Sequence, residues 1–414
     1  MAAEPIFPPV PVRPSPSATL GAVARRLAGL FLTLTLVCVL APSSERPPGS
    51  HGAWNTQASQ ARASHAAGLA QGRGLAGGID PGPYARMLRP GVAPGPHWRE
   101  GLAGVFLGLC LGLSAWHLLG DNAWVLLAMA LAWGLRLLPA SALPAFLILL
   151  DGLYAGELAR RAPWNDERSA ALMRQALGLS MGLGLAGLMQ GRLLGLEVVV
   201  LALGCLRLAL ARRLLQAGLL TAGALLGTWL FWALAGQPAA GLAQYLGSGM
   251  ALLLAAPALA LKALGAPRWQ VVAYLAVAAL LLAATWLRRR GDGAGRVLTV
   301  AMLAAFLGTG FLQGFAGPAP HGAAAADAMA VALFTAWGLR VVSGGLALGG
   351  VLAIVVVAGP YPSFLPAAMQ ARARDTYVAP AQSLAAWLRG AGLDAADTAA
   401  RGLRGLARHL GFQA

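Results

Sequence analysis

One polar segment in the first quarter of the chain contains the side chains best suited to chemistry. Asp80 lies in a stretch rich in glycine and proline and is followed by Arg86 and Arg89. Arg99 and Glu100 come next, directly before a long apolar stretch. A carboxylate can act as a general base, and guanidinium groups can hold a phosphate through paired hydrogen bonds. The segment therefore predicts catalytic acids at Asp80 and Glu100, with the three arginines binding phosphate. In the alternative interpretation, Asp80 only caps a turn.

A second set of ionisable residues lies inside apolar stretches. Asp151, Tyr154 and Glu157 follow one another at intervals of three residues, which places them on one side of a helix. Ionisable groups within a membrane are costly and are often functional, so this series would suit a proton or cation relay. The alternative is a helix end at which Glu157 pairs with Arg160 or Arg161.

Two further pairs of ionisable residues could lie close together. Arg174 and Glu197 could pair across neighbouring helices, either as a structural ion pair or as part of a transport site. His117 lies four residues before Asp121, and the two share a face only if the helix continues between them. One such pair supplies too few ligands for a transition metal. The sequence therefore predicts no metal site, and it shows no motif for a cofactor.

All of these residues must be positioned by membrane helices. Of the 414 residues, 58% are hydrophobic and 11% are charged, and the mean hydropathy is +0.66. From Gly101 to Ala358, one apolar stretch follows another, and most are long enough to cross a hydrocarbon layer about 30 Å thick. The sequence predicts an all-α, polytopic integral membrane protein. The expected helices within residues 101–358 lie at 101–119, 122–138, 142–159, 169–190, 193–211, 214–236, 242–264, 269–287, 296–315, 326–340 and 342–358.

The segments outside this transmembrane domain have distinct compositions. Residues 1–20 are rich in proline and are expected to be a disordered leader. Residues 21–42 are expected to form a first transmembrane helix, and the alternative for this segment is a cleaved signal peptide. Residues 43–100 are expected to be a long external loop. Residues 359–414 form an extramembrane tail, in which leucines and arginines on opposite faces predict an amphipathic helix lying on the membrane.

The arginines predict how the chain is oriented. The positive-inside rule places Arg25 and Arg26 in the cytoplasm, with loop 43–100 outside. The later cluster at residues 288–290 is inside only if segment 242–264 does not cross the membrane. That interpretation predicts eleven spans with the tail outside, whereas a crossing would give twelve spans with the tail inside.

Several classes of function are disfavoured by the sequence. The net charge is +16, but the basic residues are scattered over loops and form no patch with interleaved aromatic residues, so no nucleic-acid partner is predicted. The sequence contains no P-loop, zinc-protease or serine-hydrolase motif. A soluble ATPase or protease module is therefore not predicted within this chain.

The architecture resembles GT-C-fold glycosyltransferases and related bacterial surface-polysaccharide membrane proteins. Those proteins have many spans and a long first external loop with an acidic residue. The resemblance implies that Asp80 serves catalysis on a lipid-phosphate-linked sugar, with Glu100 as the second candidate.

A short stretch near the end of the apolar region is similar to a motif of large polytopic bacterial membrane proteins, G-F-V-R-H-D-x-H. Gly314, Phe315 and His321 match it, whereas glycine, proline and alanine replace its Arg, His and Asp. The similarity implies a substrate-binding role for His321, in a copy whose activity is reduced or lost.

These observations predict a bacterial inner-membrane protein that handles lipid-linked glycans, either as a glycosyltransferase-like enzyme or in polysaccharide assembly. The expected partners are membrane lipid and a polyprenyl-phosphate-linked sugar. Two alternatives remain, a secondary transporter and a non-catalytic membrane scaffold.

Overall fold

A computed structural model describes residues 16–40, 84, 98–135, 137–160, 167–235, 237, 239–264, 269–288, 293–315 and 323–358. The regular elements within these ranges are all helical, which confirms the expected all-α class for this part of the chain. The helices are α1 (Pro16–Leu40), α3 (Trp98–Leu119), α4 (Ala123–Gly134), α5 (Leu143–Arg160), α6 (Glu167–Met189), α7 (Leu194–Leu210), α8 (Leu214–Leu234), α9 (Ala239–Leu264), α10 (Trp269–Arg288), α11 (Gly293–Phe315), α12 (Ala323–Gly338) and α13 (Gly344–Ala358). Two 3₁₀ turns, η2 (Ala140–Ala142) and η3 (Gly191–Leu193), precede α5 and α7.

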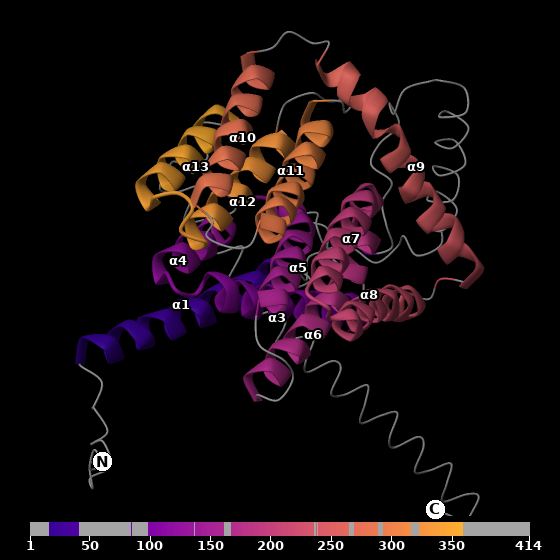
Figure 1. Ribbon diagram of the computed structural model, residues 1–414, viewed down its shortest axis with the longest axis horizontal. Coiled ribbons are helices and arrows are strands. Elements are labelled where there is room, and N and C mark those ends of the chain that lie inside the picture. Colours follow the sequence, from indigo (N-terminus) through magenta and orange to yellow (C-terminus); the bar gives the residue numbers. More distant parts are fainter. Residues whose placement is uncertain are drawn as a thin grey trace, which may run out of the picture.

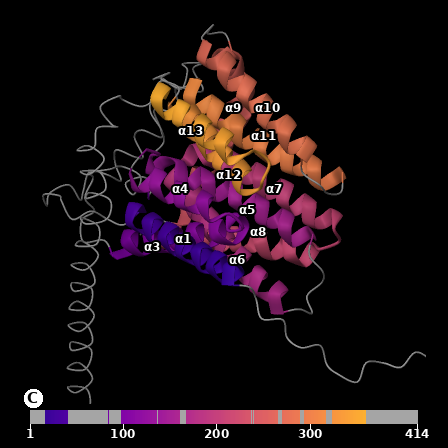
Figure 2. The same ribbon diagram turned by 90° about the vertical axis from the view of Figure 1, so that its left-hand side faces the viewer.

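Six helical segments in the described ranges are long and apolar enough to cross a membrane: Gly21–Leu40, Gly101–Leu119, Ala140–Arg160, Leu214–Leu234, Trp269–Arg288 and Gly293–Phe315. Shorter apolar helices lie between them in the sequence. Figure 2 shows the long helices side by side in roughly the same direction. These features indicate a multi-pass membrane protein.

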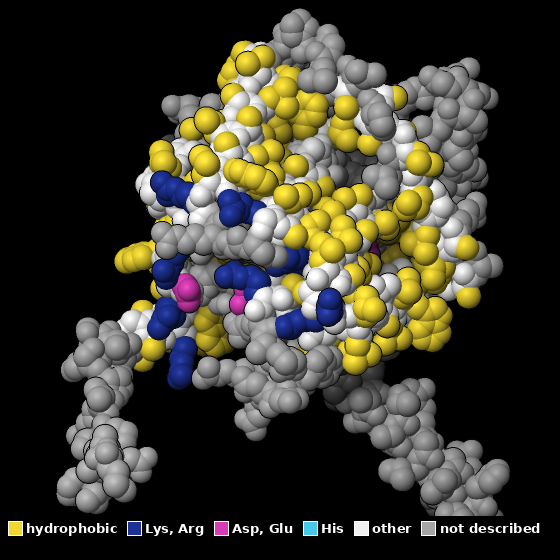
Figure 3. Space-filling view, in the orientation of Figure 1, with side chains coloured by type: hydrophobic (Ala, Val, Ile, Leu, Met, Phe, Trp, Pro, Cys, Tyr) yellow, Lys and Arg dark blue, Asp and Glu magenta, His cyan; other side chains and the backbone are white. Residues whose placement is uncertain are grey.

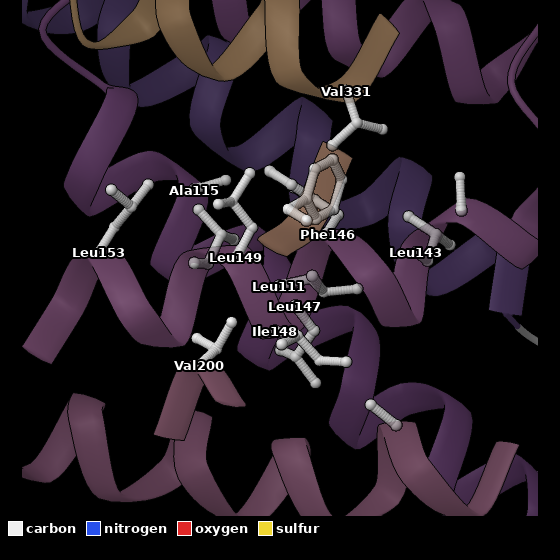
Figure 4. Close-up of a cluster of buried hydrophobic side chains, with 14 of the residues drawn as sticks. Leu111, Ala115, Leu143, Phe146, Leu147, Ile148, Leu149, Leu153, Val200 and Val331 are labelled. Carbon is white, nitrogen blue, oxygen red and sulfur yellow. The ribbon is translucent and has the colours of Figure 1, made fainter. Parts of the chain in front are cut away.

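Helix α5 forms the centre of the bundle (Figure 1). In its apolar stretch 78% of the residues are buried, whereas in the apolar stretch of α10 only 28% are buried. The four consecutive residues 146–149 are all buried, and together they cover every side of one helical turn. Figure 4 shows them packed among side chains from three other helices, including Leu111 of α3, Val200 of α7 and Val331 of α12. Only neighbouring helices, not lipid, therefore surround this part of α5.

Helices α1 and α3 pack closely because glycine lies at their contact. A Cβ atom on Gly112 would lie 2.6 Å from the Cα of Thr33, and one on Gly108 would lie 2.8 Å from the Cα of Val37. Such contacts between backbones are typical of helix pairs in membranes, where small residues allow close approach. The glycines at four-residue spacing in α3 thus form an interhelical face.

Arginine residues gather at one end of the bundle, which we call the arginine end. Arg213, at the start of α8, donates a hydrogen bond to the Leu158 carbonyl near the end of α5. Arg296, at the start of α11, lies 5.8 Å above the ring of Trp286 near the end of α10. Figure 3 shows Lys and Arg side chains gathered across the face in view, with hydrophobic side chains above and beside them. Among the described side chains, arginine is thus concentrated at one end of the helices.

Two turns at the arginine end place arginine where glycine is usual. Arg212 and Arg340 adopt φ angles of 59° and 58°, in the left-handed region. The second turn is closed by a 2.7 Å hydrogen bond from the Val341 N–H to the Ala336 carbonyl. A left-handed conformation costs a non-glycine residue about 1–2 kcal/mol. Positive charge is therefore kept at these turns despite a local conformational cost.

Helix α9 does not carry the chain from one end of the bundle to the other. At its start, Tyr245 packs 5.4 Å from Trp232 of α8 and donates a 2.7 Å hydrogen bond to the Gly187 carbonyl, near the end of α6. Helix α10 begins at the same end, because Tyr274 donates a 2.7 Å hydrogen bond to the Leu307 carbonyl in the second half of α11. We call this the distal end. In Figure 1, α9 runs along the side of the bundle between these two contacts.

The first helix begins earlier than the sequence predicts. Helix α1 starts at Pro16, within the segment expected to be a leader. Proline is favoured at the first position of a helix, because its fixed φ suits the helix and its missing N–H has no partner there anyway. The tail at residues 359–414 and most of the loop at residues 43–97 lie outside the described residues.

The close packing of α1 and α3 leads to a stability prediction. We expect Gly112→Ala to lower the free energy of unfolding by about 1–3 kcal/mol, because the new Cβ would push the two backbones apart. Gly308 in α11 serves as the matched control, because a Cβ atom added there would meet no other atom within 4 Å. Gly308→Ala should leave stability unchanged or raise it by up to about 1 kcal/mol through helix propensity. Thermal unfolding in detergent measures both variants, and equal shifts would contradict the interpretation.

Candidate functional site

A pocket opens at the distal end, where α5 begins, α11 ends and α12 begins. The cavity leaves about 30 Å³ for the centres of water-sized molecules and is continuous with the outside. The walls are mainly apolar and include Ala142, Leu193, Leu196, Phe306 and Val331. Pockets with apolar walls and a few polar groups are the usual form of small-molecule sites.

Four polar residues line this pocket: Ser141, Thr309, Gln313 and Asp327. The Nε2 atom of Gln313 is buried and has no hydrogen-bond partner among the described residues. Asp327 is partly buried and contributes a carboxylate from the first turns of α12. Because a buried donor without a partner costs about 1–3 kcal/mol, a bound acceptor at Gln313 would be stabilising. The pocket can therefore accept a polar group that both donates and accepts hydrogen bonds.

Two helix breaks shape one wall of the pocket. Pro139 adopts an extended conformation before η2, so α4 and α5 cannot form one continuous helix. Gln190 interrupts the chain between α6 and η3, and its amide donates a 3.1 Å hydrogen bond to the Ser141 carbonyl of η2. This bond ties the two breaks together and positions Ser141 at the pocket.

The stretch that resembles a G-F-V-R-H-D-x-H motif contributes to the same pocket. Its first residues form the last turns of α11, where Gly310 and Gln313 line the cavity. Gly310 and Gly314 pack against alanines of α12 so closely that a Cβ would collide with them. His321 lies outside the described residues. The glycines of the stretch therefore allow α11 and α12 to approach at the pocket.

One residue of the long loop is described, and it is attached to the distal end. Tyr84 is only 1% exposed, and its hydroxyl donates a 2.8 Å hydrogen bond to the Phe231 carbonyl near the end of α8. Its backbone N–H also donates to the Leu188 carbonyl of α6, at 3.3 Å. Because its hydroxyl is already engaged, Tyr84 serves as an anchor for the loop.

The residues that the sequence proposed as a catalytic and phosphate-binding group cannot be placed together. Asp80, Arg86 and Arg89 lie outside the described residues. Arg99 and Glu100 form part of the first turn of α3, and only their backbone is described. Their roles remain predictions.

Two carboxyl groups lie deep in the bundle. Asp151 of α5 is 2% exposed and accepts a 2.9 Å hydrogen bond from the Ser180 hydroxyl of α6. Glu197 of α7 is 6% exposed, and its Oε2 atom lies against Gly187 without a hydrogen-bond partner among the described residues. Arg174 lies more than three helical turns before Gly187 on α6, so its backbone is roughly 20 Å away along the axis. The expected pair of Arg174 with Glu197 is therefore wrong.

The structure decides between two interpretations of the charges at the arginine end. Glu157 lies 3.8 Å from Arg160, as expected for a structural pair at a helix end. Helix α3 ends before Asp121, whose carboxylate lies 3.7 Å from Arg340 rather than sharing a helix face with His117. Both partners of this second pair are exposed, and such pairs contribute little to stability.

Comparison with known protein families, with curated proteins and with solved structures found no match to this chain. The resemblance to GT-C-fold glycosyltransferases therefore rests on the sequence features alone.

Asp327 is the pocket residue that sequence reasoning missed. A signal was available, since this carboxylate stands alone in the stretch Ala323–Met329, where all other residues are alanine or methionine. An ionisable residue in an apolar helix is a functional candidate by default. Gln313 carried no comparable signal, because its position in the pocket depends on how α11 meets α5 and α12.

Proposed function

We propose that this chain is a bacterial inner-membrane protein that binds a lipid-linked glycan at the distal end, as a glycosyltransferase-like or polysaccharide-assembly protein. The observation that carries the proposal is the pocket that is lined by both Asp327 and Gln313, whose amide Nε2 has no partner among the described residues. Sugar hydroxyls both donate and accept hydrogen bonds, so they can satisfy a carboxylate and an amide N–H at once.

The lipid part of such a substrate would pack against the outward side of α10. Helix α10 begins beside the pocket, because the Tyr274 hydroxyl lies 3.3 Å from the Cβ position of Gly310. On its outward side, Trp269 is 66% exposed and Val272 is 67% exposed. A polyprenyl chain would pack along these side chains while its polar head enters the pocket, with Trp269 at the membrane interface.

The proposed arrangement has eleven spans, formed by α1, α3 to α8 and α10 to α13, with α9 at the distal end. The positive-inside rule then places the arginine end in the cytoplasm and the pocket outside. The contacts of α8 and α10 with the same end of the bundle support eleven spans over twelve.

The long loop would complete the site. Asp80 precedes Tyr84 by four residues, and an extended chain covers at most about 3.6 Å per residue, so the two backbones lie within roughly 14 Å. In this proposal the anchor at Tyr84 holds the loop, and with it Asp80, at the distal end. In this proposal Asp80 is the catalytic base, Glu100 is the second acid, Arg86, Arg89 and Arg99 bind the carrier phosphates, and His321 contacts the sugar.

Asp327 provides the first test of the proposal. We expect Asp327→Asn to weaken binding of a polyprenyl-phosphate-linked sugar by at least about tenfold, since hydrogen bonds to charged groups contribute about 1.5–3 kcal/mol. Native mass spectrometry of the protein in detergent measures the affinity. Asp121→Asn, which removes an exposed carboxylate at the opposite end, is the matched control and should bind like the wild type. Unchanged affinity of Asp327→Asn would exclude the pocket as the sugar site.

Asp80 provides the second test. We expect Asp80→Asn to abolish any surface-glycan phenotype in cells while protein levels stay unchanged, because the amide cannot accept a proton. Immunoblotting of membranes and staining of surface glycan are the two measurements. A normal glycan in this variant would remove Asp80 from the proposed machinery without affecting the role of the pocket.

A further inference from the structure

We propose that buried polar side chains along α5 form a proton pathway between the two ends of the bundle, with Asp151 and Glu197 as its carriers. This function goes beyond the handling of a lipid-linked glycan and does not depend on it. It belongs to the class of secondary transport, in which intramembrane carboxyl groups carry protons.

The central step of the pathway lies where α5, α6 and α7 meet. Asp151 projects from α5 toward α6, where it accepts the 2.9 Å hydrogen bond from Ser180. Glu197 projects from α7 toward the same helix and lies against Gly187. The two carboxyl groups are close enough for their charges to interact. Both acids therefore contact one face of α6, within reach of each other electrostatically.

The packing around these acids is built from small residues. A Cβ atom on Gly187 would collide with Oε2 of Glu197, and one on Gly152, next to Asp151, would lie 2.7 Å from Val200 of α7 and 2.9 Å from Met302 of α11. No larger side chain could occupy either position without displacing these groups. The backbone at Gly187 thus leaves just enough room for the Glu197 carboxyl group, and Gly152 allows α5 to pack closely against α7 and α11.

Neither acid is paired with a cation among the side chains that the structure describes. An ionised carboxylate buried without a counter-charge costs several kcal/mol, which a purely structural residue would not justify. A group that binds and releases a proton accounts for this burial without a counter-charge.

Toward the arginine end, the pathway continues to the surface. Tyr154, one turn after Asp151 on α5, is fully buried, and its ring stacks on His117 of α3 with 5.7 Å between the ring centres. His117 is exposed, so it can exchange protons with water. Glu157 follows one further turn along α5 and pairs with Arg160.

Toward the distal end, Glu197 lies in the first turn of α7, beside the helix break that contains Gln190. Gln190 donates to the Ser141 carbonyl, and Ser141 lines the pocket. The other charged side chain of α7 is Arg207, which lies nearly three turns further along, near the arginine end. Arg192 lies in η3, between this break and α7, and its side chain is outside the described part of the chain.

The chemistry of each step is proton transfer alone. The O–H bond of a protonated carboxyl group breaks as an O–H bond forms on an intervening water molecule, which passes one of its own protons to the other carboxylate, and water at each end supplies or accepts the proton. No electron transfer or co-reactant is needed. The direction is set by the proton gradient and the membrane potential.

The test uses the full-length protein in liposomes that enclose a pH-sensitive dye. A potassium gradient with valinomycin imposes a potential, and we expect faster acidification than in protein-free liposomes. Asp151→Asn and Glu197→Gln, which keep the shape and some hydrogen bonding of each side chain, should reduce the rate to that of protein-free liposomes. Asp121→Asn is the control carboxylate variant and should conduct like the wild type.

Each outcome decides the proposal. A wild-type rate equal to that of protein-free liposomes would overturn it, as would variants that conduct normally. Sodium uptake without acidification would assign the acids to a metal cation instead and would also overturn it. Should Asp151→Asn or Glu197→Gln not elute as a single species in detergent, Ser180→Ala replaces it, and this variant should slow acidification without abolishing it. Loss of sugar binding in Asp327→Asn has no bearing on these rates, so the two proposals fail separately.

Discussion

The structure depends on one constraint, which is that apolar side chains must meet lipid or each other while charged groups must reach water or be neutralised. The described helices satisfy their backbone hydrogen bonds internally, so they can lie in hydrocarbon. Arginines gather at one end, even at turns where glycine would fit better, such as Arg212 and Arg340. Because the described arginines lie at the ends of the helices, the few polar side chains that lie between the helices are candidates for function.

The same constraint explains why the bundle has a protected centre. Helix α5 is surrounded by other helices, so Asp151 and Tyr154 are kept from lipid without facing bulk water. At the distal end, residues of α5, α11 and α12 line a pocket with Asp327 on its wall. The molecule thus combines a polar site at one end with a buried acid pair in its middle, and the two are separated along α5.

Much of the architecture could be predicted from the sequence, because long apolar stretches are a strong signal. The helix class and most helix positions follow from them. The site was harder to predict, since it depends on which helices meet. Hydropathy cannot show that Gln313 and Asp327 face one pocket, that Tyr84 is an anchor, or that Arg174 lies far from Glu197.

The position of α9 is the central structural claim, because it decides which end of every later helix faces outward. Reporter domains that are active only outside the cytoplasm, inserted after Ala235, Gly265 and Gly291, test it most directly. The account predicts activity at Ala235 and Gly265, on either side of α9, and none at Gly291. Activity at Ala235 and Gly291 without activity at Gly265 would contradict it, since α9 would then cross the membrane.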